Sequence, residues 1–225
     1  MKNIKEIKFS VSKSAGEVSG LLQLPINSIA LLVFAHGAGA PMDHPFMNNM
    51  ANFLADELVG TLRYNFPYTE KKLKRIDPLP ILLKTVEAAS IAGKKYSDDI
   101  PLFAGGKSMG GRMTSQAAAA NTLNGVNGLV FFGFPLHAPG KESIERAEHL
   151  FHVNIPMLFL QGTRDKLANL DLLKPIISKL GKKAELNIIE GADHSFHVLK
   201  SSGKSDDEVL KEVAIKVRDW IQSLA

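Results

Sequence analysis

Cysteine is absent from the 225-residue sequence, and no apolar run is long enough to span a bilayer. Without cysteine the chain has no disulfide, no thiol nucleophile and no zinc–thiolate site, and this composition is compatible with a reducing compartment. The longest apolar runs, Ile29–Ala35 and Leu129–Phe134, are far shorter than the roughly 20 residues of a membrane-spanning helix. The first residues, from Met1 to Lys8, also lack the continuous apolar core of a signal peptide. We therefore expect a soluble, cytoplasmic protein with no membrane partner.

A strong excess of charge of either sign is missing as well. Lys and Arg together number 27 against 23 Asp and Glu, which gives a formal net charge of +4 and an isoelectric point near 9.2. The basic residues are scattered and interleaved with acidic ones, which argues against a nucleic-acid partner. The densest basic run, Lys71–Arg75, is typical of a solvated loop, although it could also form an anion-binding rim.

Internal repeats, low-complexity tracts and linker-like segments are also absent. A chain of 225 residues with 45% hydrophobic and 22% charged residues has the composition of a globular protein that can bury a substantial core. We therefore expect one domain over residues 1–225.

Short apolar runs alternate with helix-like segments along the chain. The apolar runs predict strands at Ile4–Val11, Glu17–Leu24, Ile29–Ala35, Thr61–Phe66, Ile100–Ala104, Val126–Phe134, Pro156–Gln161 and Ala184–Ile189. Helical spacing of apolar residues predicts helices at Phe46–Val59, Ile81–Ala92, Met109–Ala120, Lys141–Leu150, Leu170–Leu180 and Asp206–Leu224. A basic, proline-containing loop is expected between Pro67 and Leu79.

This alternation predicts an α/β fold with a mostly parallel sheet and helices on both faces. The first two strands are expected to pair as an antiparallel hairpin across Ala15 and Gly16. The segment between Phe134 and Pro156 is short, so any cap over a site at this end of the sheet is minimal or absent.

A Gly-x-Ser-x-Gly motif, Gly106-Lys107-Ser108-Met109-Gly110, follows one of the predicted buried strands and opens a predicted helix. A serine on such a strand–turn–helix junction is typical of a nucleophile elbow, in which the hydroxyl is exposed above the sheet. Small residues must flank the serine because the two backbones crowd the turn. The motif therefore predicts Ser108 as a catalytic nucleophile.

Acidic and histidine partners for Ser108 are expected at the carboxyl ends of later strands, where parallel sheets bind their ligands. Asp165 follows the strand at Pro156–Gln161, and His194 follows the last strand. The order Ser108, Asp165, His194 is the one that serine enzymes of this strand–helix architecture use. Asp193 and Asp171 are rival acids.

These three residue types divide the chemistry of acyl transfer among them. A serine hydroxyl is a poor nucleophile until a base takes its proton. His194 is expected to accept that proton and later return it to the leaving group. Asp165 is expected to fix the imidazole tautomer and to stabilise the imidazolium.

An oxyanion hole needs two backbone donors near Ser108. One is predicted to be the N–H of Met109, the residue after the nucleophile, and the other the N–H of Ala38 in the loop His36-Gly37-Ala38-Gly39. His36 itself could line the pocket, or it could form hydrogen bonds that shape this turn.

Several further residues could contribute to a substrate pocket or serve only the core. Four of them follow strand ends and could wall an acyl pocket or pack in the interior: Phe66, Tyr68, Phe134 and Leu136. Three arginines could meet a substrate carboxylate: Arg63, Arg75 and Arg112. The histidines form no convincing metal set, and Gly106-Lys107-Ser108 lacks the upstream glycine of a phosphate loop, where Leu102 stands. We expect neither a metal nor a cofactor.

Three blocks of sequence carry a resemblance to a known family: Ala35–Ala40, Gly105–Arg112 and Gly191–Phe196. Across nearly its whole length the chain resembles an alpha/beta-hydrolase, of the small and nearly capless branch near dienelactone hydrolases. The blocks are similar to a subgroup that includes animal testis-expressed proteins and a chromatin-complex subunit. The resemblance implies an eight-strand-type sheet and a serine-hydrolase site on Ser108, Asp165 and His194. Dienelactone hydrolases proper use a cysteine nucleophile, so Ser108 argues against their substrate.

Two functions are therefore open at the level of sequence. The first is a serine hydrolase that cleaves small carboxylic esters or thioesters through an acyl-enzyme on Ser108, with a small-molecule acyl substrate. The second is an interaction module with the same fold and no turnover, as some members of the subgroup are thought to be. The intact set of Ser108, Asp165 and His194 favours the first, since a scaffold has no chemical need for them.

Overall fold

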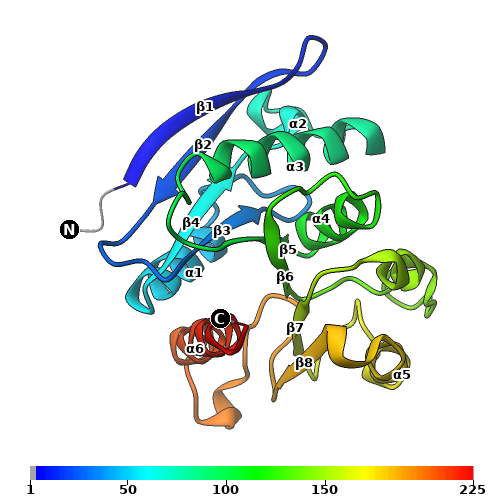
Figure 1. Cartoon of the computed structure of the whole chain (residues 1–225). Coiled ribbons are helices and arrows are strands. Elements are labelled where there is room, and N and C mark those ends of the chain that lie inside the picture. Colours follow the sequence, from blue (N-terminus) through cyan, green and yellow to red (C-terminus); the bar gives the residue numbers. More distant parts are fainter. Residues whose placement is uncertain (1–3, 225) are drawn as a thin grey trace.

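The computed structural model describes residues 4–224, so residues 1–3 and 225 of the expected single domain lie outside the described residues. One eight-stranded sheet runs through the described chain in the order β1-β2-β4-β3-β5-β6-β7-β8 (Figure 1). Its strands are β1 (Ile4–Ser12), β2 (Gly16–Gln23), β3 (Ala30–Ala35), β4 (Val59–Tyr64), β5 (Leu102–Lys107), β6 (Val126–Phe132), β7 (Met157–Gly162) and β8 (Ala184–Ile189).

The sheet is antiparallel at its N-terminal edge and parallel elsewhere. β1 pairs with β2 as the expected hairpin, and β2 pairs antiparallel with β4. From β4 across β3, β5, β6 and β7 to β8 every pair is parallel. The predicted fold class, a mostly parallel sheet with an N-terminal antiparallel hairpin, is therefore confirmed.

In the described part of the chain six α-helices flank the sheet: α1 (Pro45–Asp56), α2 (Pro67–Glu70), α3 (Leu79–Lys94), α4 (Met109–Ala119), α5 (Leu170–Leu180) and α6 (Asp206–Ser223). Alternating residues of each central strand face opposite sides of the sheet. In β3, Leu31 and Val33 pack on the face covered by α3, α4 and α5, whereas Leu32 and Phe34 pack on the face covered by α1 and α6. The central strands are thus buried on both faces, which explains their continuous apolar sequences.

Two predicted segments differ in part from the structure. The short helix predicted at Lys141–Leu150 is a 3-10 helix, η1 (Glu145–His152), which begins four residues later. Its buried residues Ala147 and Leu150 recur three residues apart, the spacing at which side chains align on a 3-10 helix. The expected loop after Pro67 begins with the short helix α2, because proline at a first helical position has the φ angle that a helix needs.

Within residues 4–224, no helix combines the length and the apolar character that crossing a membrane requires. The segment that joins β6 to β7 holds only η1 and a bridge between Ala138 and Lys141, so the cap at this end of the sheet is minimal, as predicted.

The order of the strands places the candidate site at the middle of the sheet. The chain runs from β3 to β4 on one side and then returns to β5 on the other side of β3. The loops that follow β3 and β5 therefore leave the sheet side by side, with a crevice between them. The loop after β3 holds Ala38, and the turn after β5 holds Ser108.

Candidate active site

Ser108 lies at the sharp turn between β5 and α4. Its backbone has φ +51° and ψ −116°, a strained conformation for a residue that carries a side chain. The Ser108 N–H donates to the Phe132 carbonyl of the neighbouring strand at 3.2 Å, and the Ser108 carbonyl accepts the first backbone bond of α4 from Arg112. Strand and helix thus hold the strained residue from both sides.

The two flanking glycines are required by close backbone contacts. A Cβ atom on Gly106 would lie 2.5 Å from the Ala35 carbonyl oxygen, and one on Gly110 would lie 2.6 Å from the carbonyl oxygens of both Ala35 and His36. These distances are shorter than any van der Waals contact, and a backbone neighbour cannot move aside as a side chain can. The glycines of the motif let β5 and α4 approach the end of β3.

Ser108, His194 and Asp165 form one hydrogen-bonded chain. His194 Nε2 lies 2.9 Å from Ser108 Oγ, and His194 Nδ1 lies 2.7 Å from Asp165 Oδ2. Because a carboxylate only accepts, the proton of the neutral imidazole is on Nδ1, and Nε2 is free to accept from the serine hydroxyl. The structure thus brings together the three residues that the strand-end argument selected.

Asp165 is held in a fixed orientation by donors other than His194. Its side chain is fully buried, Gln161 Nε2 donates to Oδ2 at 2.5 Å, and the Leu167 N–H donates to Oδ1 at 2.8 Å. A buried carboxylate needs such partners because it has lost its hydration. They also hold the oxygen that receives the His194 N–H.

The rival acids have other roles. Asp193 Oδ1 accepts from the N–H groups of Ser195 and His197 and so closes the turn that carries His194. Asp171 is an exposed residue in the first turn of α5. Neither forms a hydrogen bond with His194 in the described residues, whereas Asp165 does.

Both predicted oxyanion donors lie at the site. Met109 is the first residue of α4, and the first N–H groups of a helix have no partner within it. Ala38 lines the same cavity as Ser108. The next residue, Gly39, has φ +72° and donates its N–H to the Tyr68 hydroxyl at 3.3 Å. The Met109 N–H thus lies beside the serine at the positive end of a helix dipole, and Ala38 lies in the loop that lines the same cavity.

His36 shapes the loop after β3. Its ring is completely buried, Nε2 accepts from the Phe66 N–H at 3.2 Å, and Nδ1 lies 2.8 Å from the Gly37 carbonyl. Burial lowers the pKa of His36 to about 4, since the charged ring would lose its hydration. The ring is therefore neutral, with the proton on Nδ1 donated to Gly37, and of its two predicted roles it has the structural one.

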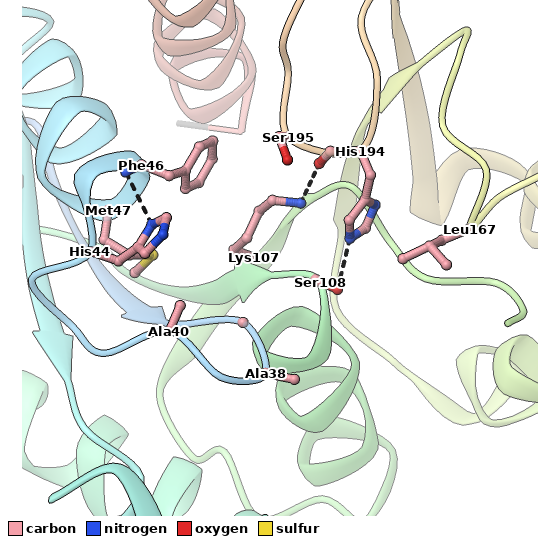
Figure 2. Close-up of a pocket in the computed structure, with 11 residues that line it drawn as sticks. Ala38, Ala40, His44, Phe46, Met47, Lys107, Ser108, Leu167, His194 and Ser195 are labelled. Carbon is pink, nitrogen blue, oxygen red and sulfur yellow. Dashed lines mark hydrogen bonds between the residues drawn. The ribbon is translucent and has the colours of Figure 1, made fainter. Parts of the chain in front are cut away.

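Ser108 and His194 lie at a cavity of about 410 Å³ that is lined by these two residues and by the surrounding loops (Figure 2). Its other lining residues come from the loops after β3 and β7, the start of α1, the end of β5 and the His194 turn: Gly37, Ala38, Ala40, His44, Phe46, Met47, Lys107, Leu167 and Ser195. Most of the wall is apolar, which suits a small acyl or alkyl group.

The four aromatic and aliphatic residues proposed as acyl-pocket walls do not line this cavity. Phe66, Phe134 and Leu136 are at most 1% exposed and belong to the core between the sheet and α3–α5. Tyr68 lines a neighbouring hollow instead. The walls come from Phe46 and Met47 of α1, which the sequence showed only as part of a helical face.

The three arginines proposed to meet a substrate carboxylate also lie away from the cavity. Arg63 is buried under the loop after β3, where it donates to Asn48 and to the Met42 carbonyl. Arg75 is exposed in the basic loop, and Arg112 lies on α4 within electrostatic range of Arg146 of η1. None of the three is among the residues that line the cavity beside Ser108.

Lys107 is the site residue that sequence reasoning missed. Its side chain enters the cavity, and Nζ donates to the main-chain carbonyl of His194 at 2.5 Å (Figure 2). The available signal was a charged residue between Gly106 and Ser108 at the end of a buried strand. Such a side chain has to leave the sheet at the same edge as the serine.

No metal centre forms among the described residues. Residues 4–224 contain no group of three or more His, Asp or Glu side chains placed to hold a metal ion. His197 Nδ1 lies 2.8 Å from a carboxylate oxygen of Asp206, the first residue of α6. His149 Nε2 forms a hydrogen bond of 2.7 Å with Ser115 Oγ.

Fold and site together define the class. Residues 28–222 match the Alpha/beta hydrolase domain family, and the chain therefore belongs to that family. The backbone conformation of Ser108 and the close contacts of its flanking glycines are those expected of the nucleophile elbow in this family.

Solved structures of similar fold come from several bacteria. A dienelactone hydrolase from Anabaena variabilis is 22% identical, with a TM-score of 0.72 over 98% of each chain. A serine hydrolase without lid from Xanthomonas campestris is 17% identical, with a TM-score of 0.71 over 100% of this chain and 94% of that one. The esterase domain of a Rhodothermus marinus protein is 14% identical, with a TM-score of 0.71 over 97% of each chain. At these identities the likeness concerns the fold.

Proposed function

We propose that the protein is a serine hydrolase that cleaves small carboxylic esters or thioesters through an acyl-enzyme on Ser108. The observation that carries the proposal is the hydrogen-bonded chain from Ser108 Oγ through His194 to Asp165 at the edge of a mostly apolar cavity. A scaffold would gain nothing from a strained serine that shares its hydroxyl proton with a neutral imidazole.

In the first half of the reaction Ser108 Oγ attacks the carbonyl carbon of the bound ester. Its proton moves to His194 Nε2 as the new C–O bond forms, and the carbonyl electron pair moves to the oxygen. Met109 and Ala38 donate their N–H groups to this oxyanion. The imidazolium then gives its proton to the alcohol or thiol leaving group, and the acyl group stays on Ser108.

In the second half a water molecule takes the place of the leaving group. His194 Nε2 accepts one proton from the water as its oxygen attacks the acyl carbon, and the same proton returns to Ser108 Oγ when the carboxylic acid leaves. Asp165 stays ionised throughout and stabilises the imidazolium across the 2.7 Å contact.

The cavity limits the size of the substrate. A volume of about 410 Å³ is at the small end of ligand pockets, and the short segment between β6 and β7 adds little over it. Short acyl chains and small leaving groups therefore fit this site best. Within the family we place the chain in the small branch near dienelactone hydrolases, with the testis-expressed and chromatin-complex-subunit proteins, on the sequence blocks around His36, Ser108 and His194.

Turnover of a series of p-nitrophenyl esters from acetate to octanoate tests the proposal. We expect hydrolysis that falls with acyl length and that drops by about 10³-fold or more in Ser108→Ala. The same rate in Ser108→Ala would contradict the assignment of the nucleophile. A stable co-purifying protein combined with no turnover of any ester in the series would favour the interaction module instead.

A further inference from the structure

Lys107 is the only lysine or arginine among the residues that line the Ser108 cavity, and no Asp or Glu of the described chain lines it. The other charged candidates, Arg63, Arg75 and Arg112, lie elsewhere, as described above. The cavity thus presents one ammonium group within otherwise mostly apolar walls.

The ammonium of Lys107 lies between the His194 turn and two aromatic rings. Nζ donates to the His194 carbonyl at 2.5 Å, and it lies 5.6 Å and 5.7 Å from the ring centroids of Phe46 and Phe196. Figure 2 shows the side chain extending between Phe46 and His194, on the cavity side of the strand that ends at Ser108. The His194 carbonyl takes one of the three N–H donors of the ammonium, and the two ring faces interact with its charge at these distances without taking a hydrogen bond to oxygen.

The nearest carboxylates do not neutralise Lys107. Asp165 is occupied by His194, Gln161 and the Leu167 N–H, and Asp193 accepts from Ser195 and His197. Within residues 4–224, no ion pair of 4.0 Å or less involves Lys107.

Burial lowers the pKa of Lys107 to about 8, while the charges of Asp165 and Asp193 act in the opposite direction. The side chain therefore still carries its proton at neutral pH. A charge that is removed from water without an ionic partner is costly to the folded protein. An anion bound in the cavity would supply the missing partner.

We propose that the substrate carries a carboxylate close to its ester, and that Lys107 binds this carboxylate beside Ser108. This inference rests on the proposed function. The substrate class is then the monoesters of short dicarboxylic acids, or acyl esters of small hydroxy acids. Water cleaves the ester through Ser108 into an acid and an alcohol, and the carboxylate on Lys107 takes no part in bond making or breaking.

The contacts of Lys107 limit the distance between the two ends of such a substrate. Its Nζ lies 2.5 Å from the carbonyl oxygen of His194, whose ring reaches Ser108 Oγ at 2.9 Å. We therefore expect a short chain of a few carbons between the carboxylate and the reacting carbonyl, which agrees with the volume of the cavity.

Two pairs of esters, matched in length and differing in charge, test the inference by kcat/KM at pH 7. Monoethyl glutarate is compared with ethyl valerate, which places the carboxylate on the acyl side. 4-Acetoxybenzoate is compared with phenyl acetate, which places it on the leaving-group side. We expect the charged ester of at least one pair to be preferred by about tenfold or more, the range of one charge-assisted hydrogen bond.

Variants separate charge recognition from a merely structural role of Lys107. In Lys107→Met the preference for the charged ester is expected to vanish, and in Lys107→Arg part of it should remain. Lys95 is an exposed lysine that follows α3, at the edge of the sheet opposite to the one that carries Ser108. Lys95→Met removes the same net charge as Lys107→Met and should keep the wild-type preference. In the wild type the preference should also fall as pH rises through about 8, where Lys107 loses its proton.

The inference is overturned if wild type shows no preference in either pair, or if Lys107→Met slows charged and neutral esters by equal factors. Equal factors would mean that Lys107 only holds the His194 turn. If a fluorophosphonate labels Ser108 but none of the four esters is turned over, the carboxylate inference fails and the serine nucleophile stands. If neither labelling nor turnover is seen, the proposed function fails and the inference fails with it.

Discussion

Asp165 and His194 are 29 residues apart in the sequence, and their side chains meet at 2.7 Å. Asp165 follows β7 and His194 follows β8, and these two strands are parallel neighbours. Adjacent parallel strands end at the same edge of a sheet, so the loops after them are brought side by side whatever their distance along the chain. The acid and the base of the proposed reaction depend on this one strand pairing.

Replacement of the acid tests its role in the proposed reaction. Asp165→Asn is expected to lower kcat by about 10³–10⁴-fold, because an amide that donates to Nδ1 favours the wrong imidazole tautomer. The fall should appear in kcat rather than in KM, measured with a short p-nitrophenyl ester.

The rival acid offers the matched control for that experiment. Asp193→Asn keeps an oxygen that can accept from Ser195 and His197, and we expect it to lower kcat by less than about tenfold. An equal loss in both variants, or a larger loss in Asp193→Asn, would contradict the assignment of Asp165.

Gly110, the second flanking glycine of the motif, should be needed for the stability of the fold. Gly110→Ala places a Cβ 2.6 Å from two carbonyl oxygens, and we expect it to reduce the free energy of unfolding by about 1–3 kcal/mol. Urea denaturation followed by circular dichroism measures this change. In Gly37→Ala the nearest atoms to the new Cβ are 3.6–3.7 Å away, so its stability should stay within about 0.5 kcal/mol of wild type. A tolerated Gly110→Ala would show that the elbow is looser than the structure has it.

Acid should destabilise the protein partly through His36. Its folded-state pKa of about 4 lies below its ordinary value of 6.5, so between these two pH values the unfolded chain binds a proton that the folded chain does not. The free energy of unfolding therefore falls as the pH falls from 6.5 towards 4, by at most about 1.4 kcal/mol per pH unit for this one group. Urea denaturation of wild type and His36→Gln across this range measures the contribution as a difference in slope. Parallel curves for the two proteins would show that His36 makes no such contribution.

The arrangement of Ser108, Asp165 and His194 could be predicted because it follows from topology. Short apolar runs in the sequence indicate buried strands, and the residues that follow parallel strands lie at one edge of the sheet. The loop role of His36 was one of two possibilities that the sequence left open. The hydrogen bonds to Phe66 and Gly37 decide it.

The walls of the cavity could not be predicted in the same way. Phe66 and Phe134 follow strand ends, as Asp165 does, but their side chains turn into the core. The direction of a side chain after a strand depends on how the loop bends, and that bend is fixed by long-range contacts such as Arg63 to Met42 and Gly39 to Tyr68. Sequence spacing carries no information on such contacts.

The labelling of Ser108 by a fluorophosphonate tests the central claim most directly. We expect wild type to gain the mass of one phosphonyl group, with the modified peptide containing Ser108, and Ser108→Ala to gain none. Asp165→Asn should react more slowly than wild type, since the serine then lacks a correctly oriented base. No labelling of the folded wild type, or equal labelling of Ser108→Ala, would contradict the account.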